Sequence, residues 1–565
     1  MVEFSVKICG EAGQGTQTIG NALCLAFKNS GYHVFAIQDF MSRIRGGNNF
    51  FQLRASHQPV SCPRRLSRLI ITLDKASPRI HAASLEPGGV IIADCKKFLL
   101  DANQPGIFDV PLYTIAAGFG DEMYINSAAA GIAAYICALG LPALGAVFNK
   151  IFSAKGGEIT AKNCQAAEAG YKYAAANFKG QRFDCAPSAA GKYLLNGNDA
   201  IALAAIRAGC KFYTAYPMSP STGIMTTIAE YASRCGILVE QAEDEIAAVN
   251  MAIGASFAGA RAMAATSGGG FMLMMEGVSL AGMTETPLVV ADIQRPAPAT
   301  GFPTRTEQAD LDFLLSAGHG EFARLIFTPG TPQEAFALTL KAFDLAEKYQ
   351  IPAFILSDQY LADSYCDAAE LDFQSPVEKR RIISFEESAT VNNYKRYCLT
   401  DSGISPQAVP GWIKEAIYAD SDEHTPEGHI TEDAAIRVQM VEKRLYKKMA
   451  GLTREIVAPT AFSLDGADIV LVGFGSTYGL LRELSLASGK RKIGAVHLSQ
   501  AWPFPSEIMA GLLKGHKRIF TLENNAGAQL AKLLRRETGI TAEGSILKFD
   551  GRPFSMEDAQ EKIPE

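Results

Sequence analysis

The sequence predicts an α/β protein, in which helices alternate with the strands of parallel sheets. Four short apolar runs between Lys211 and Gln308 each end in a polar or glycine-rich tip, and their spacing is that of strands separated by helices. Two glycine-rich turns, at 10–15 and 473–477, each follow a strand-like run and precede a helical pattern. At 565 residues the chain is long enough for three or four such units.

Composition gives no reason to expect a nucleic-acid partner or a membrane. The net charge is -6 and the pI is near 5.9, and the charged fraction of 20% and hydrophobic fraction of 48% are ordinary for a globular protein. The run 125–149 has the length of a membrane span, but it is mostly Ala and Gly and contains Pro142. We therefore expect a closely packed pair of helices there.

The 11 cysteines indicate reduced thiols in a cytoplasmic protein. They are scattered, and no two have the C-x-x-C spacing of a zinc ribbon or of an iron–sulfur cluster bound by this chain alone. The N-terminus has no basic region followed by a long apolar one, so we expect no signal peptide. Mostly buried, reduced thiols are typical of the cytoplasm.

The N-terminal part is expected to form a Rossmann-like unit. A strand over 2–8 leads through a glycine turn, which includes Gly13 and Gly15, into a helix over 16–29. Such a turn points backbone N–H groups at a ligand above the helix start, which suits a phosphate, although tight strand-to-helix packing would need the same glycines. The acid that would bind an NAD ribose could only be Asp39, which lies beyond its strand, so NAD is not favoured.

A second loop could face the same phosphate. Arg43 and Arg45 precede two glycines and a strand over 50–54, so the loop either contributes to an anion site or is simply solvated. Further strands over 69–73 and 90–94 would complete the unit.

Changes of pattern divide the rest of the chain. The segment 178–192 is polar and irregular and is typical of a linker. A charged amphipathic helix over 432–449 is expected to expose one solvated face, with Arg437, Lys443, Arg444, Lys447 and Lys448. The expected domains are 1–180 (Rossmann-like), 181–193 (linker), 194–365 (central α/β domain), 366–458 (irregular or helical connection) and 459–565 (a smaller α/β domain).

The tips of the four central strands predict the site. In parallel sheets ligands bind outside the carboxyl ends of the strands, where these tips gather. The tips carry a hydroxyl in Ser219, an acid at a helix start in Glu245, a glycine turn at 266–270 and the cation Arg295. This combination predicts a binding site for an organic anion.

Eight motifs stand out, in this order: YPMSPST (216–222), EDEIAA (243–248), TSG (266–268), QR (294–295), PTRTEQADL (303–311), GHGE (318–321), DQYLADS (358–364) and GFGST (473–477). They resemble the alpha subunits of 2-oxoacid:ferredoxin oxidoreductases, and the first 180 residues resemble the family's gamma subunit, here fused ahead of alpha. The resemblance covers nearly the whole chain. It departs from the family at Ser219, where the family has Thr, at Gly269, where it has Pro, and at Ala297 and Ala299, where it has Gly and Ser, all at the substrate end of the pocket.

The resemblance implies thiamine diphosphate as cofactor, a pyrimidine-binding central domain and a transketolase-C-like last domain. Glu245 then shares a proton with the pyrimidine ring nitrogen, a role that requires a carboxyl in an apolar, helix-start position. Glu243 competes for this role, and all three acids at 243–245 could merely complement a helix dipole. The further cofactor-binding residues that we expect are Tyr216, Pro217, Thr266, Ser267 and Gly268, with Gly13 and Gly15 in the first unit.

A second chain is needed to complete the cofactor site. Thiamine enzymes bind Mg²⁺ and the diphosphate with a Gly-Asp-Gly segment, and this sequence has none. The family supplies that segment on a beta subunit, which also carries the [4Fe-4S] cluster, so this chain is expected to bind no metal. The expected assembly is a dimer of heterodimers that passes electrons to ferredoxin and uses coenzyme A as a substrate.

The expected reaction is CoA-dependent oxidative decarboxylation of 2-oxoglutarate to succinyl-CoA and CO₂. Arg295 would bind the carboxylate that all 2-oxoacids share, and Ser219 would donate its hydroxyl to that carboxylate or to the keto oxygen. Arg305 would bind the distal carboxylate, unless it is a solvated loop residue. The alternatives are a subunit that acts on pyruvate, indolepyruvate or branched-chain 2-oxoacids, and a non-catalytic nucleotide- or CoA-binding scaffold.

Overall fold

The computed structural model describes residues 3–42, 46–184, 187–188, 191–368, 370–374, 380–487 and 491–565. Arg43 and Arg45, on which the expectation of a second basic loop rests, lie outside these residues. The chain divides into two compact units, which are described separately here. Unit 1 comprises 1–195, 363–370 and 554–565, and unit 2 comprises 196–362 and 371–553.

Unit 1 is built on a mixed sheet with the strand order β6-β5-β4-β1-β3-β2-β14-β7. The strands β1, β4, β5 and β6 run parallel, as the Rossmann-like prediction requires, whereas β3, β2, β14 and β7 extend the sheet with antiparallel pairs. The strands are β1 (Glu3–Ala12), β2 (His33–Asp39), β3 (Gly46–Ser56), β4 (Ser67–Thr72), β5 (Leu85–Ala93), β6 (Ile107–Asp109), β7 (Tyr193–Leu195) and β14 (Tyr365–Ala368).

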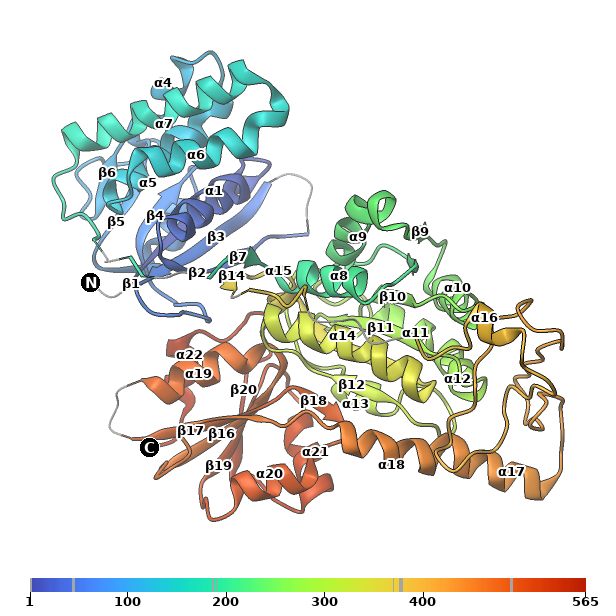
Figure 1. Ribbon diagram of the computed structural model, residues 1–565. Helices are drawn as coiled ribbons and strands as arrows, with labels where there is room; N and C mark the ends of the chain where they lie inside the picture. Colours follow the sequence, from blue (N-terminus) through green and yellow to red (C-terminus); the bar gives the residue numbers. More distant parts are fainter. Residues whose placement is uncertain are drawn as a thin grey trace. The chain divides into compact units, whose positions relative to one another are not determined.

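The helices α1 (Thr16–Asn29), α5 (Ile125–Ile136), α6 (Leu141–Phe152) and α7 (Gly157–Asn177) pack on one face of this sheet (Figure 1). The pair α5 and α7 is packed closely, because a Cβ on Gly131 would lie 1.9 Å from the carbonyl oxygen of Ala167. The run 125–149 forms two helices, α5 and most of α6, as predicted, and the close packing of α5 is against α7. In the described part of the chain, no helix is long and apolar enough to cross a membrane.

The central sheet of unit 2 has the order β18-β12-β13-β11-β10-β8-β9, and its neighbours are parallel except for the β12–β18 pair. The strands β10, β11 and β13 are buried along their whole length, as expected for a parallel sheet that is covered on both faces. The strands are β8 (Phe212–Ala215), β9 (Leu238–Gln241), β10 (Ala262–Thr266), β11 (Leu288–Gln294), β12 (Leu325–Phe327), β13 (Pro352–Asp358) and β18 (Gln500–Trp502).

Helices on this sheet position the strand ends (Figure 1). Asp244 caps the start of α10 and so fixes the position of Glu245, the first residue of the helix. The Asp244 carboxylate accepts the backbone N–H of Ala247 at 2.8 Å. The helices are α8 (Gly197–Arg207), α9 (Thr222–Cys235), α10 (Glu245–Phe257), α11 (Gly268–Leu273), α12 (Met275–Met283), α13 (Leu311–Leu315), α14 (Pro332–Tyr349) and α15 (Gln359–Asp363).

A second sheet of unit 2 forms the C-terminal part, in the order β15-β17-β16-β19-β20. It shares one hydrophobic core with the central sheet, to which Val290 and Val472 both contribute. Its elements are β15 (Thr460–Phe462), β16 (Ile469–Phe474), α19 (Tyr478–Leu486), β17 (Ile493–Leu498), α20 (Ser506–Leu513), β19 (Ile519–Glu523), α21 (Gln529–Thr538) and β20 (Gly544–Leu547). The described structure thus confirms the α/β fold class.

The prediction of one solvated face over 432–449 is wrong for three of its five cations. The helix α17 (Ala434–Val441) passes through a π-helical turn (Glu442–Lys447) into α18 (Lys448–Leu452). Lys443 and Lys448 are fully buried, and their ammonium groups each lie 2.6 Å from the buried carboxylate of Glu285. Arg444 is also buried, where it pairs with Glu423 at 2.6 Å. These ion pairs anchor the segment to unit 2.

Candidate active site

The predicted site residues of the central domain gather at the carboxyl edge of the central sheet. Thr266 of β10 pairs in register with Asp292 of β11, and Thr214 of β8 pairs with Ala264 of β10, so the tips that follow these strands lie side by side. Tyr216, Pro217 and Ser219 follow β8, whereas Arg295 follows β11. The organisation predicted for the four tips is therefore present in unit 2.

Glu245 is the first residue of α10 and is buried, with 3% of its surface exposed. Its Oε1 atom has no hydrogen-bond partner among the described residues. A Cβ on Gly270 would lie 2.4 Å from this oxygen, so the glycine lets α11 approach the carboxyl. Burial raises the pKa of Glu245, whereas nearby Arg295 lowers it. Glu243, the competing acid, is exposed, so Glu245 is the acid that enters the interior.

Arg295 reaches from β11 to the loop after β8. Its Nη1 donates a hydrogen bond of 2.6 Å to the carbonyl oxygen of Ser219, which brings these two predicted residues together. Burial lowers the pKa of Arg295, and the carboxylates of Asp310 and Glu245 raise it. The Ser219 side chain is exposed, so its hydroxyl is accessible to a ligand.

The glycine turn after β10 packs tightly on its neighbours. Thr266 and Ser267 are fully buried, and the Ser267 hydroxyl has no partner within the described chain. A Cβ on Gly268 would lie 2.4 Å from a carboxylate oxygen of Asp310. The absence of side chains at 268 and 270 thus allows two carboxyl groups to approach this turn.

Sequence reasoning missed two acids of this site, Asp292 and Asp310. Asp292 lies within the apolar strand β11 and is fully buried, and neither of its carboxyl oxygens has a hydrogen-bond partner in the described residues. Asp310 is 8% exposed, and its backbone N–H donates to Gln294 Oε1 at 2.9 Å. The signal was present, because a charged residue inside a buried parallel strand is rare without a partner.

The segment 303–310 is fixed from the C-terminal part of unit 2. The side chain of Gln308 donates to the carbonyl oxygen of Phe474 at 3.0 Å and accepts the backbone N–H of Asn524 at 3.1 Å. Ser476, in the motif GFGST, donates to Asp358 at 2.5 Å. Arg305 packs against Gly551, because a Cβ added to this glycine would lie 3.3 Å from the Cβ of Arg305. These motifs therefore hold the loop that carries Arg305 and Asp310.

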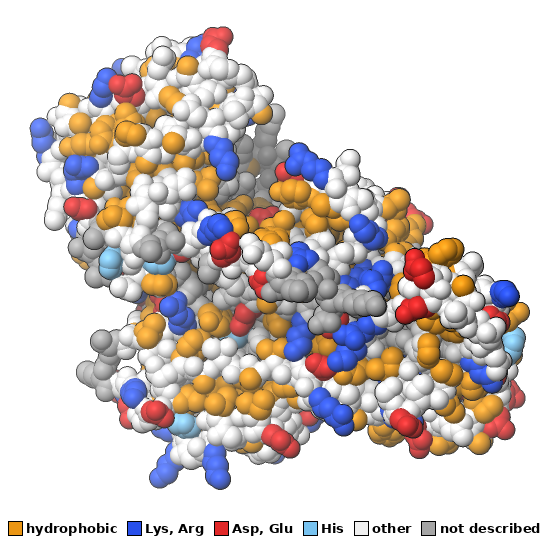
Figure 2. Space-filling model, in the orientation of Figure 1, with side chains coloured by type: hydrophobic (Ala, Val, Ile, Leu, Met, Phe, Trp, Pro, Cys, Tyr) orange, Lys and Arg blue, Asp and Glu red, His pale blue; other side chains and the backbone are white. Residues whose placement is uncertain are grey.

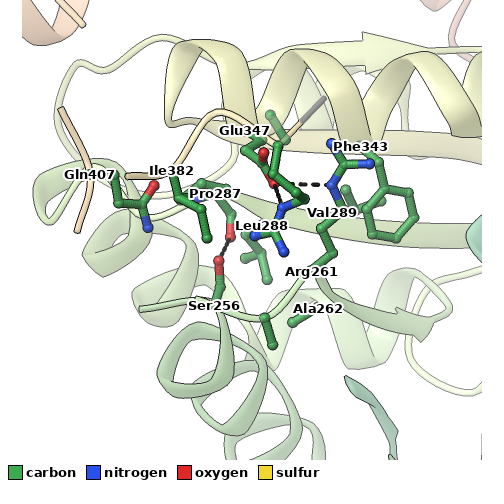
Figure 3. A pocket seen from close by; sticks show the side chains of 13 residues that line it. Ser256, Arg261, Ala262, Pro287, Leu288, Val289, Phe343, Glu347, Ile382 and Gln407 are labelled. Atoms are coloured by element: carbon green, nitrogen blue, oxygen red, sulfur yellow. Dashed lines mark hydrogen bonds and ion pairs between the residues drawn. The ribbon is translucent and has the colours of Figure 1, made fainter. Parts of the chain in front are cut away.

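A separate small cavity lies at the opposite, amino end of the central strands (Figure 3). Its volume is about 10 Å³, which is roughly the space of one water molecule. The buried carboxylate of Glu347 accepts hydrogen bonds from Arg261 at 3.0 Å and Arg380 at 2.8 Å beside it. These ion pairs fix the segment around Arg380. The cavity itself is too small for an organic substrate.

The glycine turn of unit 1 also borders a cavity, of about 380 Å³. Gly13 has a φ of 91° and open space where a Cβ would point, whereas a Cβ on Gly15 would lie 2.2 Å from the side-chain amide of Asn126. The helix α1 begins at this turn with no acidic residue in its first turn and no side-chain cap. Gln14, Tyr113, Asn126, Ser127, Lys155 and Asn163 are among the lining residues.

The comparisons with known proteins agree with this geometry. The family model described as "Pyruvate flavodoxin/ferredoxin oxidoreductase, thiamine diP-bdg" matches residues 203–443, which include Glu245 and Arg295. The model described as "Pyruvate ferredoxin/flavodoxin oxidoreductase" matches residues 5–173. A 2-oxoacid:ferredoxin oxidoreductase subunit alpha from Sulfolobus is 31% identical over 100% of this chain and 96% of its own length. The chain belongs to the 2-oxoacid:ferredoxin oxidoreductase alpha-subunit family.

Two further relatives of this oxidoreductase subunit carry 2-oxoglutarate in their names. The 2-oxoglutarate synthase subunit KorA of Methanothermobacter marburgensis is 30% identical over 66% of this chain and 98% of its own length. A solved 2-oxoglutarate:ferredoxin oxidoreductase from Magnetococcus marinus, with 2-oxoglutarate, coenzyme A and succinyl-CoA bound, aligns at 29% identity and a TM-score of 0.91 over 100% of each chain. The chain is thus a subunit of an oxidoreductase with a thiamine-diphosphate-binding domain.

The described part of this oxidoreductase subunit contains no cluster of side chains that could form a metal site. Among the described residues, no group of three or more His, Cys, Asp and Glu side chains is placed to hold a metal ion. All ten described cysteines are free thiols, and six of them, Cys9, Cys24, Cys62, Cys95, Cys137 and Cys210, are buried.

Proposed function

We propose that this chain is the gamma–alpha part of an enzyme that oxidatively decarboxylates 2-oxoglutarate to succinyl-CoA and CO₂ with electrons passed to ferredoxin. The observation that carries the proposal is the buried carboxyl group of Glu245, whose Oε1 atom has no hydrogen-bond partner among the described residues and which lies beside Arg295 and the turn 266–270. A buried carboxyl oxygen without a partner costs free energy unless a ligand satisfies it.

The residues fit the pyrimidine half of thiamine diphosphate. Glu245 would share a proton with a ring nitrogen, and a raised pKa favours the protonated form that can donate it. Thr266, Ser267 and Gly268 would line the same half, and Tyr216 and Pro217 would border it. When bound, the cofactor supplies the nucleophilic carbon on which 2-oxoacids lose CO₂.

We infer that a beta subunit completes the site and supplies the Mg²⁺ ligands, the diphosphate ligands and a [4Fe-4S] cluster. Around Glu245, the helices α10 and α11 expose several large apolar side chains, as expected for a surface that another chain covers. Figure 2 shows hydrophobic side chains on the face of unit 2 that carries α9 and α10. The exposed side chains are Ile246 (51%), Met251 (37%), Met272 (57%) and Leu273 (50%).

Arg295 and Ser219 are proposed to bind the part that all 2-oxoacids share. The guanidinium is half-buried and already oriented by its hydrogen bond to the Ser219 carbonyl, so little side-chain entropy is lost when a carboxylate binds. Arg305 is proposed to pair with the distal carboxylate of 2-oxoglutarate. The names of the KorA relative and of the Magnetococcus marinus enzyme support this choice of substrate.

Coenzyme A is proposed to use the cavity beside Gly13 and Gly15. Its volume suits part of a coenzyme, and the start of α1 and Lys155 can both attract a phosphate. Saturable CoA binding to the full chain that weakens in Lys155→Ala is expected. Saturable micromolar binding of NADH to this unit would contradict the assignment.

The decisive experiment is turnover of the complex with its partner subunit. We expect kcat/KM for 2-oxoglutarate to exceed that for pyruvate by at least about 10-fold, the discrimination that one charge-assisted bond provides. Equal values would overturn the choice of substrate and leave the thiamine assignment intact. Failure of the complex to turn over any 2-oxoacid with thiamine diphosphate would favour the alternative of a binding scaffold.

A further inference from the structure

The loop 303–310 carries Arg305, the residue proposed to bind the distal carboxylate, and one end of this loop is fixed to the central sheet. Gln294 accepts the backbone N–H of Asp310 at 2.9 Å. Gln294 is the last residue of β11 and is buried, and Arg295 follows it directly. The end of the loop is therefore held beside the arginine that is proposed to bind the shared carboxylate.

Gln308, two residues earlier, is fixed to the C-terminal sheet by all of its polar atoms. Its side chain donates to the carbonyl oxygen of Phe474 at 3.0 Å and accepts the backbone N–H of Asn524 at 3.1 Å. Its backbone N–H donates to the carbonyl oxygen of Asn524 at 2.7 Å, and its carbonyl oxygen accepts the side-chain amide of Asn525 at 3.1 Å. Phe474 ends β16 and Asn524 follows β19, so the ends of two strands determine where Gln308 lies.

The support behind Gln308 is itself fully bonded. The amide of Asn525 also donates to Glu523 at 2.9 Å, and its oxygen accepts the backbone N–H of Ala528 at 2.9 Å. The carboxylate of Glu523 accepts two further backbone N–H groups at the start of α21, at 2.8 and 3.1 Å. Glu523 and Asn525 are both fully buried. A buried polar network in which these groups are satisfied holds a single arrangement rigidly.

The backbone at Arg305 lies where the C-terminal sheet meets the central sheet. Gly551, in the loop after β20, accepts the backbone N–H of Thr306 at 3.2 Å. A Cβ added to Gly551 would lie 3.3 Å from the Cβ of Arg305, so the glycine lets this side chain lie close. The hydroxyl of Thr306 accepts the backbone N–H of Tyr360, which follows β13, at 3.2 Å. The separation of Arg305 from Arg295 therefore depends on how the C-terminal sheet holds this loop.

We propose that Gln308 is a positioning residue for substrate length. By fixing the loop 303–310 to the C-terminal sheet, it sets the separation of Arg295 and Arg305 and so favours a 2-oxoacid that has a second carboxylate. The inference rests on the proposed roles of these two arginines and adds what holds them apart. Pre-organisation of the loop reduces the conformational entropy that is lost when a diacid binds. Pyruvate, which has no distal carboxylate, gains nothing from it.

The test is Gln308→Met in the complex with its partner subunit. Methionine keeps the length of the side chain but makes neither side-chain hydrogen bond. We expect KM for 2-oxoglutarate to rise by about 3- to 10-fold, the worth of one net intramolecular hydrogen bond. The kcat for 2-oxoglutarate, and both constants for pyruvate, should stay within about 2-fold of the wild type, because the shared carboxylate still binds Arg295. The preference for 2-oxoglutarate should therefore fall by about 3- to 10-fold.

Thr521→Val is the matched control. Thr521 is fully buried on β19, the strand that leads to Asn524, and its hydroxyl donates to Ser545 of β20 at 2.8 Å. The substitution removes a buried hydrogen bond within the same sheet and should lower the melting temperature while the substrate preference stays unchanged. The inference is overturned if Thr521→Val reduces the preference as much as Gln308→Met does. It is also overturned if Gln308→Met reduces kcat/KM equally for both substrates, because the role of Gln308 would then be structural only.

Gln529→Met is a second variant, which decides the question if Gln308→Met does not fold. Gln529, the first residue of α21, is only partly buried. Its side chain donates to the carbonyl oxygen of Ala309 at 2.7 Å and accepts the backbone N–H of Asp312 at 3.0 Å, so it holds the same loop from the C-terminal part. Gln529→Met should also lower the preference for 2-oxoglutarate, and an unchanged preference would overturn the inference.

Arg305→Ala tests the proposed function separately. If Arg305→Ala leaves the preference for 2-oxoglutarate unchanged, Arg305 does not bind the distal carboxylate, and the inference about Gln308 fails with that role. If Arg305→Ala lowers the preference while Gln308→Met leaves it unchanged, only the inference about Gln308 fails.

Discussion

Replacing Glu245 with Gln removes one ionisable proton and changes little else. The side chain is 3% exposed, one of its oxygens has no partner among the described residues, and it lies against Gly270, so Gln fits the same space. The amide preserves shape and one hydrogen bond but cannot share a proton with a ring nitrogen. We therefore expect cofactor binding to survive and turnover to fall.

The size of the loss follows from the role of a positioned acid. General acid–base groups contribute about 10²- to 10⁴-fold to rate, so Glu245→Gln should reduce kcat by about 10²-fold or more. That is about 2.7 kcal/mol or more of transition-state stabilisation, at about 1.36 kcal/mol per factor of ten. A loss confined to KM would instead indicate that Glu245 only holds the cofactor or substrate in place.

The assay is 2-oxoacid-dependent reduction of ferredoxin by the complex, together with titration of thiamine diphosphate by fluorescence quenching. Glu243→Gln is the control, because Glu243 precedes the same helix and is exposed. It should retain wild-type turnover. The reasoning is refuted if Glu243→Gln shows the 10²-fold loss and Glu245→Gln does not, because the catalytic acid would then be the exposed one.

Four further results are expected. The chain purified alone should be colourless and inactive, and iron absorbance and turnover should appear only on co-expression with a second subunit; decarboxylation by the lone chain would contradict this. Arg295→Ala should lose activity on every 2-oxoacid, whereas Arg305→Ala should lose 2-oxoglutarate selectively, as kcat/KM for the two substrates will show. In urea unfolding, Glu285→Gln should cost about 3–5 kcal/mol, because it leaves buried cations unpaired, and Lys448→Met should cost less. Burial lowers the pKa of Lys448 to about 7, so the unfolded chain binds more protons between pH 7 and 10.5 and stability should rise with pH in that window; Lys448→Met should reduce this slope.

Local signals predicted the elements that carry the site. Glu245 was predicted to stand at a helix start, and α10 does begin at this residue. The helix over 16–29 was predicted with the observed bounds. These elements were predictable because hydrophobic periodicity and helix starts depend on residues that are close together in the sequence.

Long-range pairing was not predictable in the same way. The strand β14, at 365–368, joins the sheet of unit 1 beside β2, at 33–39, more than three hundred residues away in sequence. Here His33 and the backbone N–H of Val34 both bind the carboxylate of Asp367, at 2.8 and 2.9 Å. The residues that flank Asp367 in the sequence do not indicate that it binds His33 and Val34. The same holds for Asp310, because its loop folds back so that its backbone N–H reaches the side chain of Gln294 at the end of β11.

The buried lysines show that a helix can be predicted correctly while the prediction of its solvent-exposed face is wrong. At about 100° per residue, positions five apart differ by about 140° around an α-helix, so a regular α-helix would not point Lys443 and Lys448 in the same direction. The π-helical turn over Glu442–Lys447 widens the helix between them, and both ammonium groups then reach Glu285, one at each carboxylate oxygen. Arg396 adds a third cation, through a 2.7 Å hydrogen bond to the Glu285 carbonyl oxygen. Glu285 therefore binds cations from two segments of the 371–458 region, two at its carboxylate and one at its carbonyl oxygen, which explains why charges that suggested a solvated surface are fully enclosed.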